Sequence, residues 1–160
     1  MAARPVVFIA FVAILVLLHF ILHVAFGLGQ GAPDLVTVAA LIAARRLRGG
    51  QAAALGFVLG ILDDALAITS FGASALALTV VSYLGARSRD LFEGESLLYF
   101  LVYLFLGTWL TDTIVLLVSP ETLRRTATSL LVGLPLIALW TALAGVAAVM
   151  FFRAATGERP

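Results

Sequence analysis

Long apolar runs, separated by short polar or charged segments, make up almost the whole chain. The first run, from Pro5 to Leu28, would extend about 36 Å as a helix at 1.5 Å per residue, which is enough to cross a bilayer. Because membrane β-strands alternate apolar and polar residues, near-continuous apolar runs predict helices instead. Together the runs predict an all-α polytopic membrane protein with six transmembrane helices, at about 5–28, 33–44, 51–68, 73–86, 96–118 and 130–152.

Prolines mark where two of these helices begin. Pro33 and Asp34 open the second run, and we place Asp34 in the first helical turn, where the helix dipole favours a negative charge. Pro135 predicts a kink or a late start of the last helix, because proline interrupts the backbone hydrogen-bond ladder. Several runs are shorter than the roughly twenty residues that a span needs, so we expect them to be tilted, partly re-entrant or shielded by neighbouring helices.

The composition indicates an integral membrane protein with a single domain, residues 1–160. Hydrophobic residues make up 62% of the chain and charged residues 12%, and the mean hydropathy is +1.14. Soluble domains, by contrast, are about half apolar and about a quarter charged. The chain contains no cysteine, which excludes disulfides and thiolate metal sites. A net charge of +1 gives no indication of a nucleic-acid partner, and we expect none.

The distribution of arginine predicts the orientation. Six spans place both termini on the same side of the membrane, and the side richer in basic residues is the cytoplasmic one. If the N-terminus is inside, only Arg124 and Arg125 lie outside, so we predict an N-in, C-in topology. The arginines on the cytoplasmic side are then Arg4, Arg45, Arg46, Arg48, Arg87, Arg89, Arg153 and Arg159.

Small residues and two adjacent acids distinguish the stretch from Gly49 to Gly72. Gly56, Gly60 and Asp64 are spaced i, i+4 and i+8, so a helix presents them on one face. A G-x-x-x-G pair lets another helix approach closely, and that helix is either a neighbour in this chain, the simpler interpretation, or part of a partner. Asp63 and Asp64 point about 100° apart, so we expect one to face the bundle and the other the headgroups.

Six ionisable groups share the outer half of the membrane under this orientation and form a candidate polar cluster. A histidine pair at i and i+4 together with carboxylates suits a transition metal such as nickel, cobalt or zinc. The simpler interpretation is that each group is hydrogen-bonded within the bundle, and we predict no metal and no cofactor. The six groups are His19, His23, Asp34, Asp63, Asp64 and Asp112.

Aromatic residues gather near the start of the fifth run. Tyr99 and Tyr103, with Phe92 and Phe100, predict an interfacial aromatic belt on the cytoplasmic side. No G-x-S-x-G, P-loop or H-E-x-x-H motif occurs in the chain, and no serine and lysine pair can serve as nucleophile and base. We therefore do not expect an enzyme.

The order of these features resembles the rod shape-determining protein MreD family of bacterial inner-membrane proteins. The similarity extends from about Pro33 to Arg89 and departs at Ala67-Ile68, where the family often has Ser-Gly. In it, Asp64 takes the family's aspartate position. The residues that carry it are Pro33-Asp34, then Gly56-Phe57 with Gly60-Ile61-Leu62-Asp63-Asp64-Ala65-Leu66, similar to G-F-x-x-G-L-L-x-D-L-L, and then Phe71-Gly72, Ala75-Leu76, Leu78-Thr79 and Tyr83.

This resemblance implies a non-enzymatic scaffold of the cell-elongation machinery in the inner membrane. The implied partners are MreC and, directly or through it, the actin-like MreB, the RodA glycosyltransferase and its penicillin-binding transpeptidase. On this hypothesis Gly60→Leu disrupts the complex with MreC and leaves the protein inserted. The family is also similar in architecture to the S subunits of energy-coupling-factor (ECF) transporters, so the alternative is a subunit that binds a vitamin or a transition metal.

Overall fold

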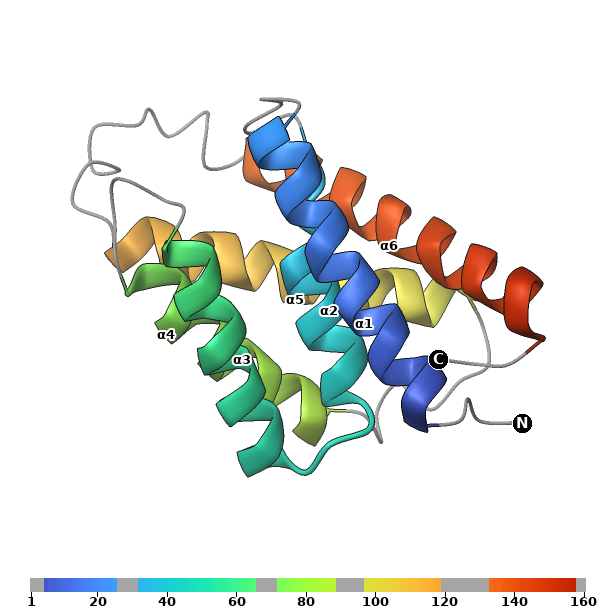
Figure 1. The fold of residues 1–160 in the computed structure, drawn as a ribbon. Coiled ribbons are helices and arrows are strands. Elements are labelled where there is room, and N and C mark those ends of the chain that lie inside the picture. The colour runs from blue at the N-terminus through green and yellow to red at the C-terminus, as the bar shows by residue number, and fades with distance from the viewer. Residues whose placement is uncertain (1–4, 26–31, 66–71, 89–96, 119–132, 158–160) are drawn as a thin grey trace.

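The computed structural model describes residues 5–25, 32–65, 72–88, 97–118 and 133–157, and these residues are all-helical. Each apolar run identified in the sequence contains a helix (Figure 1). The helices are α1 (Pro5–Phe20), continued by the π-helical turn η1 (Ile21–Ala25), α2 (Leu35–Ala44), α3 (Gly49–Asp64), α4 (Ala73–Arg87), α5 (Leu97–Val118) and α6 (Leu134–Thr156).

Local hydrogen bonds set the helix ends that differ from the prediction. α3 begins at Gly49 rather than near residue 51, because the Arg48 backbone N–H donates to Gln51 Oε1 at 3.3 Å. α6 begins late, at Leu134 with Pro135 in its first turn, as the proline predicted. It ends four residues beyond the prediction, at Thr156, and is capped by Gly157, whose φ of 66° suits glycine. The predicted spans also include 26–28, 66–68, 96 and 130–132, which lie outside the described residues.

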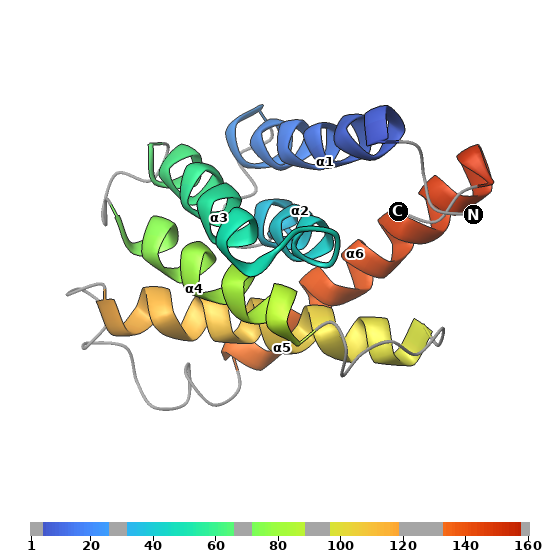
Figure 2. The same ribbon diagram turned by 90° about the horizontal axis from the view of Figure 1, so that it is seen from below.

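The short helix α2 lies at the centre of the molecule. All ten of its residues are buried, and it contacts each of the other five α-helices. Figure 2 shows it enclosed between α1 and α3 on one side and α5 on the other. At about 15 Å, α2 is only half as long as the hydrocarbon core. Its neighbours shield it, which is one of the arrangements we expected for the short runs.

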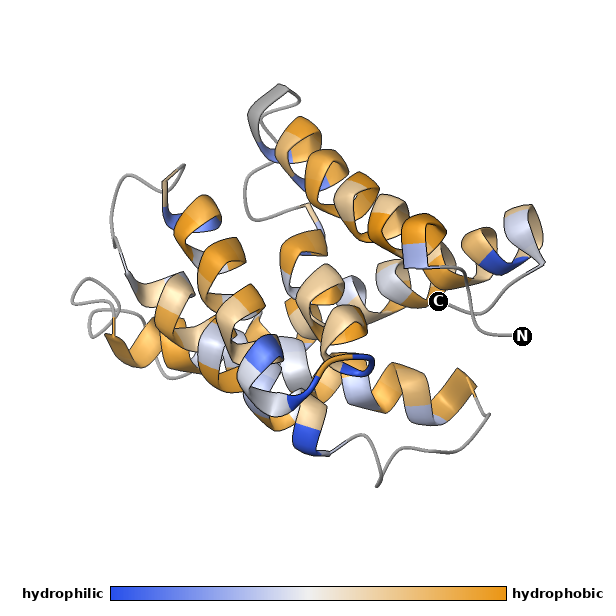
Figure 3. Cartoon of the chain, turned by 60° about the horizontal axis from the view of Figure 1, so that its bottom comes forward, coloured by the Kyte–Doolittle hydropathy of each residue, from blue (hydrophilic) through white to orange (hydrophobic). Residues whose placement is uncertain are grey.

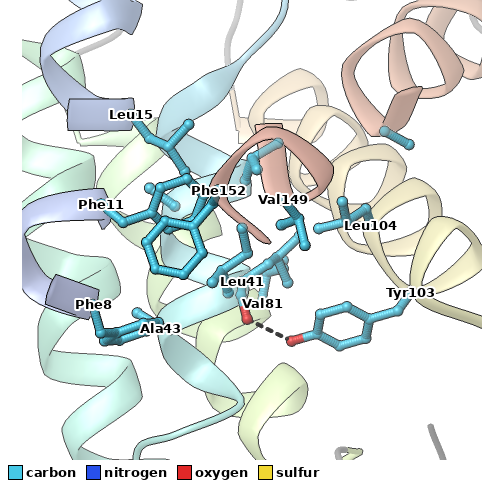
Figure 4. Packing of buried hydrophobic residues seen from close by; sticks show 14 residues of the cluster. Phe8, Phe11, Leu15, Leu41, Ala43, Val81, Tyr103, Leu104, Val149 and Phe152 are labelled. Carbon is cyan, nitrogen blue, oxygen red and sulfur yellow. Dashed lines mark hydrogen bonds between the residues drawn. The ribbon is translucent and has the colours of Figure 1, made fainter. Parts of the chain in front are cut away.

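Aromatic side chains from three helices close the core around α2 (Figure 4). The Phe11 and Phe152 rings lie 4.4 Å apart, so they join α1 to α6. The Tyr103 hydroxyl donates to the Leu41 carbonyl oxygen at 2.9 Å. Tyr103 is only 4% exposed, so its assignment to an interfacial belt is wrong: the end of α2 supplies a buried acceptor for its hydroxyl. Tyr99 is exposed.

The glycine face of α3 packs against α4. A Cβ atom at Gly56 would overlap the Leu78 carbonyl oxygen, and one at Gly60 would overlap Cα of Ala75. The two backbones can approach this closely only because both positions lack a side chain. Of the two interpretations of the G-x-x-x-G pair, the structure shows packing within the chain. It leaves no room for a partner helix at this face.

Large apolar side chains cover the outside of the bundle. In the described residues, α1 with η1, α5 and α6 are each long and apolar enough to cross a membrane. Their outward residues include Ile9, Leu117 and Phe151, which are 65%, 79% and 77% exposed. Figure 3 shows apolar residues along the outer helices and hydrophilic ones near helix ends and connections. A surface this apolar indicates a membrane protein.

Charged groups separate to opposite ends of the bundle. The Arg46 guanidinium lies 4.1 Å from the Phe8 ring centroid, which joins the end of α2 to the start of α1. Arg45 lies 5.5 Å from the Phe100 ring centroid near the start of α5. We call this end, with Arg45, Arg46, Arg48, Arg87 and Arg153, the basic end. The opposite end, with His19, His23, Asp34, Asp63, Asp64 and Asp112, is the acidic end.

Candidate functional site

Asp64 binds the first turn of α4. Its carboxylate, 1% exposed, accepts backbone N–H groups from Gly72 at 2.9 Å, and from Ser74 and Ala75 at 3.0 Å each. The first N–H groups of a helix have no partner within the helix, and the residue at the N-cap of α4, Gly72, has no side chain to offer. Asp64 supplies the cap from α3 instead, and its charge matches the helix dipole. Gly72 turns the chain with a φ of 99°, a backbone conformation that favours glycine.

Asp34 caps the first turn of the central helix, α2. It lies one position earlier than predicted, at the N-cap of α2 rather than in its first turn, because the helix begins at Leu35 after Pro33. Its Oδ1 accepts the N–H groups of Val36 and Thr37 at 3.1 Å each. The Thr37 hydroxyl donates to Oδ2 at 2.5 Å. The dipole reason for an acid at this point of the sequence is unchanged.

His19 lies between two carboxylates. Its Nε2 is 3.3 Å from Asp63 Oδ1, and its Nδ1 is 3.6 Å from Asp34 Oδ1. The His23 ring stacks on it at 4.0 Å, and His23 Nδ1 lies 3.0 Å from the His19 carbonyl oxygen. Of the two adjacent acids, Asp64 is buried, whereas the Asp63 side chain is 30% exposed and faces His19 across the ends of α3 and α1. The group joins α1, α2 and α3.

A small polar cavity lies beside this group. Its volume is about 140 Å³, room for a few water molecules at roughly 30 Å³ each and below the roughly 300 Å³ at which ligand pockets begin. Asp112 extends into the group from α5, and its buried Oδ2 accepts no hydrogen bond from the described residues. The cavity is lined by Asp34, Thr37, Asp63, Ser74, Leu78, Thr111, Asp112 and Val115.

The candidate polar cluster has two kinds of member. Asp34, Asp63 and Asp112 line the cavity, and His19 contacts the first two of them and stacks on His23. Asp64, by contrast, is engaged with α4. In the described ranges, no group of three or more histidine, aspartate or glutamate side chains is arranged to hold a metal ion. Thr37, Ser74 and Thr111 also line the cavity, and they were not predicted as site residues from the sequence. The sequence feature that could have identified them is a hydroxyl residue in an apolar helix, at the same end of the helix as the acids.

Searches against protein-family models, curated proteins and solved structures found no match to this chain. The stretch from Pro33 to Arg89, in which the sequence resembles the MreD family, contains the glycines that pack α3 against α4. It also contains Asp34 and Asp64, which cap α2 and α4.

Proposed function

We propose that this chain is a non-enzymatic membrane subunit of the bacterial cell-elongation machinery, of the MreD kind. In this proposal six helices cross the inner membrane with the basic end in the cytoplasm. The chain binds the transmembrane and juxtamembrane segment of MreC. Through that contact it helps to couple MreB to peptidoglycan synthesis by RodA and its penicillin-binding transpeptidase, and so to cell shape.

One observation supports a scaffold above the other classes. The residues that carry the resemblance, Gly56, Gly60, Asp64 and Gly72, together close the α3–α4 hairpin. Asp64 has three backbone donors and lies 1% exposed, so its carboxylate is committed to helix capping. A rigid hairpin of this kind suits a protein that presents a surface to a partner.

The separation of charge supports the orientation. Cytoplasmic ends of membrane proteins are enriched in arginine and lysine, and the basic end contains five arginines from the described residues. Asp112 apart, the charged groups at the acidic end contact each other or helix termini, which reduces the cost of placing them at membrane depth. Both findings suit six spans that place α1 to α6 in alternating directions.

The partner helix is expected on the lipid-facing side of the bundle, because α4 already covers the glycine face. Expression of the chain with the MreC transmembrane and juxtamembrane segment, followed by purification in mild detergent, tests this. We expect MreC to co-purify, and a tryptophan scan of the exposed positions Ile14, Leu117 and Leu136 to locate the contact. Failure to co-purify, or equal recovery with an unrelated six-helix protein, would contradict the proposal.

The alternative is a substrate-binding subunit of the ECF type. Its support is the histidine and aspartate group at the acidic end, and the volume of about 140 Å³ beside that group argues against a vitamin. Elemental analysis and native mass spectrometry of the purified protein separate the two proposals. A bound metal or vitamin, together with a ligand-induced rise in the unfolding temperature, would favour transport.

A further inference from the structure

A second and larger hollow lies between α4 and α5, toward the basic end. Its volume is about 350 Å³, within the range of small-molecule sites. Apolar side chains line most of it, among them Leu84 and Leu106, which are partly exposed on the outside of the bundle. The hollow is thus a groove that opens toward the lipid, and none of its lining residues belongs to the polar cavity at the acidic end.

Two glycines let the floor of the groove pack closely. A Cβ atom at Gly107 would overlap the Leu41 side chain, and one at Gly85 would come within 2.7 Å of the Tyr103 hydroxyl oxygen. The Tyr103 hydroxyl donates to the Leu41 carbonyl oxygen (Figure 4). The floor is therefore formed by well-packed groups of α2, α4 and α5.

The rim at the basic end is polar. Arg87 and Ser88, the last residue of α4 and its C-cap, both line the groove. The Arg87 Nε donates to the Tyr83 hydroxyl at 3.4 Å, and the side chain is exposed with further N–H groups that can donate to a ligand. Val81, at the apolar part of the groove, lies six residues earlier on α4, about 9 Å along the helix. Arg87 therefore lies about 9 Å along the helix from the apolar part of the groove, a distance similar to the depth of the membrane interface.

The chemistry of the groove favours a lipid as its occupant. Its walls are mostly apolar and open toward the lipid, which suits a hydrocarbon chain. An arginine at the rim is the group that binds phosphate most strongly.

We propose that the groove between α4 and α5 binds one acyl chain of an anionic phospholipid, whose phosphate is held by Arg87. Anionic lipids bind basic residues at the membrane surface, so phosphatidylglycerol is the test ligand. The site depends on membrane insertion alone. It holds whether or not the chain binds MreC.

Native mass spectrometry of the full chain in mild detergent tests the proposal. We expect dioleoyl-phosphatidylglycerol to bind in preference to dioleoyl-phosphatidylethanolamine. Arg87→Gln is expected to weaken phosphatidylglycerol binding about fivefold, the loss of one arginine at an anionic surface. Leu106→Trp fills the groove and is expected to remove the binding of both lipids.

Matched controls change the same residue types elsewhere. Arg48→Gln removes a charge at the basic end away from the groove, and Leu117→Trp changes an exposed leucine at the far end of α5; both should bind as the wild type does. Equal binding by all variants would overturn the proposal. So would equal binding of inorganic phosphate or dihexanoyl-phosphatidylglycerol, because no long chain would then be held.

Discussion

At the scale of single residues, carboxylates hold the acidic end together by accepting backbone hydrogen bonds. The pattern of the sequence showed that Asp64 needs a partner, since an ionised group at membrane depth is costly. It could not show which one, because the donors lie on Gly72, Ser74 and Ala75, 8 to 11 residues further along the chain. Asp34 was easier to interpret, because its donors lie two and three residues ahead.

Removing the Asp64 carboxylate should destabilise the protein. Asp64→Ala leaves three N–H groups at the start of α4 without an acceptor, one of them buried and two partly buried, and we expect a loss of about 3 kcal/mol in the free energy of unfolding. Thermal unfolding in detergent measures the change. Asp112→Asn is the matched control: Oδ2 of Asp112 accepts no hydrogen bond from the described residues, so its effect should be clearly smaller. An unfolding temperature for Asp64→Ala equal to that of the wild type would contradict the capping role.

At the scale of the helices, hydropathy predicted where each one lies but not which is central. The apolar run of α2 looks like any other short span, because hydropathy does not distinguish side chains that face lipid from those that face protein. Its burial follows from the number of helices that surround it. The glycine spacing of α3 predicted close packing, and only the fold could show that α4 is the neighbour.

Glycine substitutions in α3 should separate packing from helix propensity. Gly60→Ala introduces a Cβ atom that overlaps α4, whereas one at Gly50 has nothing within 4 Å. We expect Gly60→Ala to lower the unfolding temperature and Gly50→Ala to raise stability by as much as about 1 kcal/mol, the propensity difference between the two residue types.

From the sequence, Gly60→Leu is expected to disrupt the complex with MreC and to leave the protein inserted. The position of Gly60 now predicts damage to the α3–α4 hairpin itself, so the variant should lose stability before any partner is added. Thermal unfolding of the variant without MreC decides this. Stability equal to the wild type would show that the face is less tightly packed than the structure has it.

At the scale of the whole molecule, polar residues gather at two ends of an apolar bundle. The depth of the six acidic-end groups could be predicted from the spans. Their convergence could not, because sequence position fixes height along a helix and says nothing of lateral placement. The His19 contacts with Asp34 and Asp63 depend on α1 lying beside both α2 and α3. The orientation of this charge separation in the membrane underlies the proposed function.

The absence of cysteine from the chain permits a direct test of that orientation. Gly50→Cys and Ala65→Cys place single thiols at exposed positions on the two ends of α3. In intact cells, a membrane-impermeant maleimide should label the cysteine at position 65 and reach the one at position 50 only after the membrane is opened. The reverse pattern, or labelling of both from one side, would contradict a bundle that crosses the membrane with its basic end in the cytoplasm.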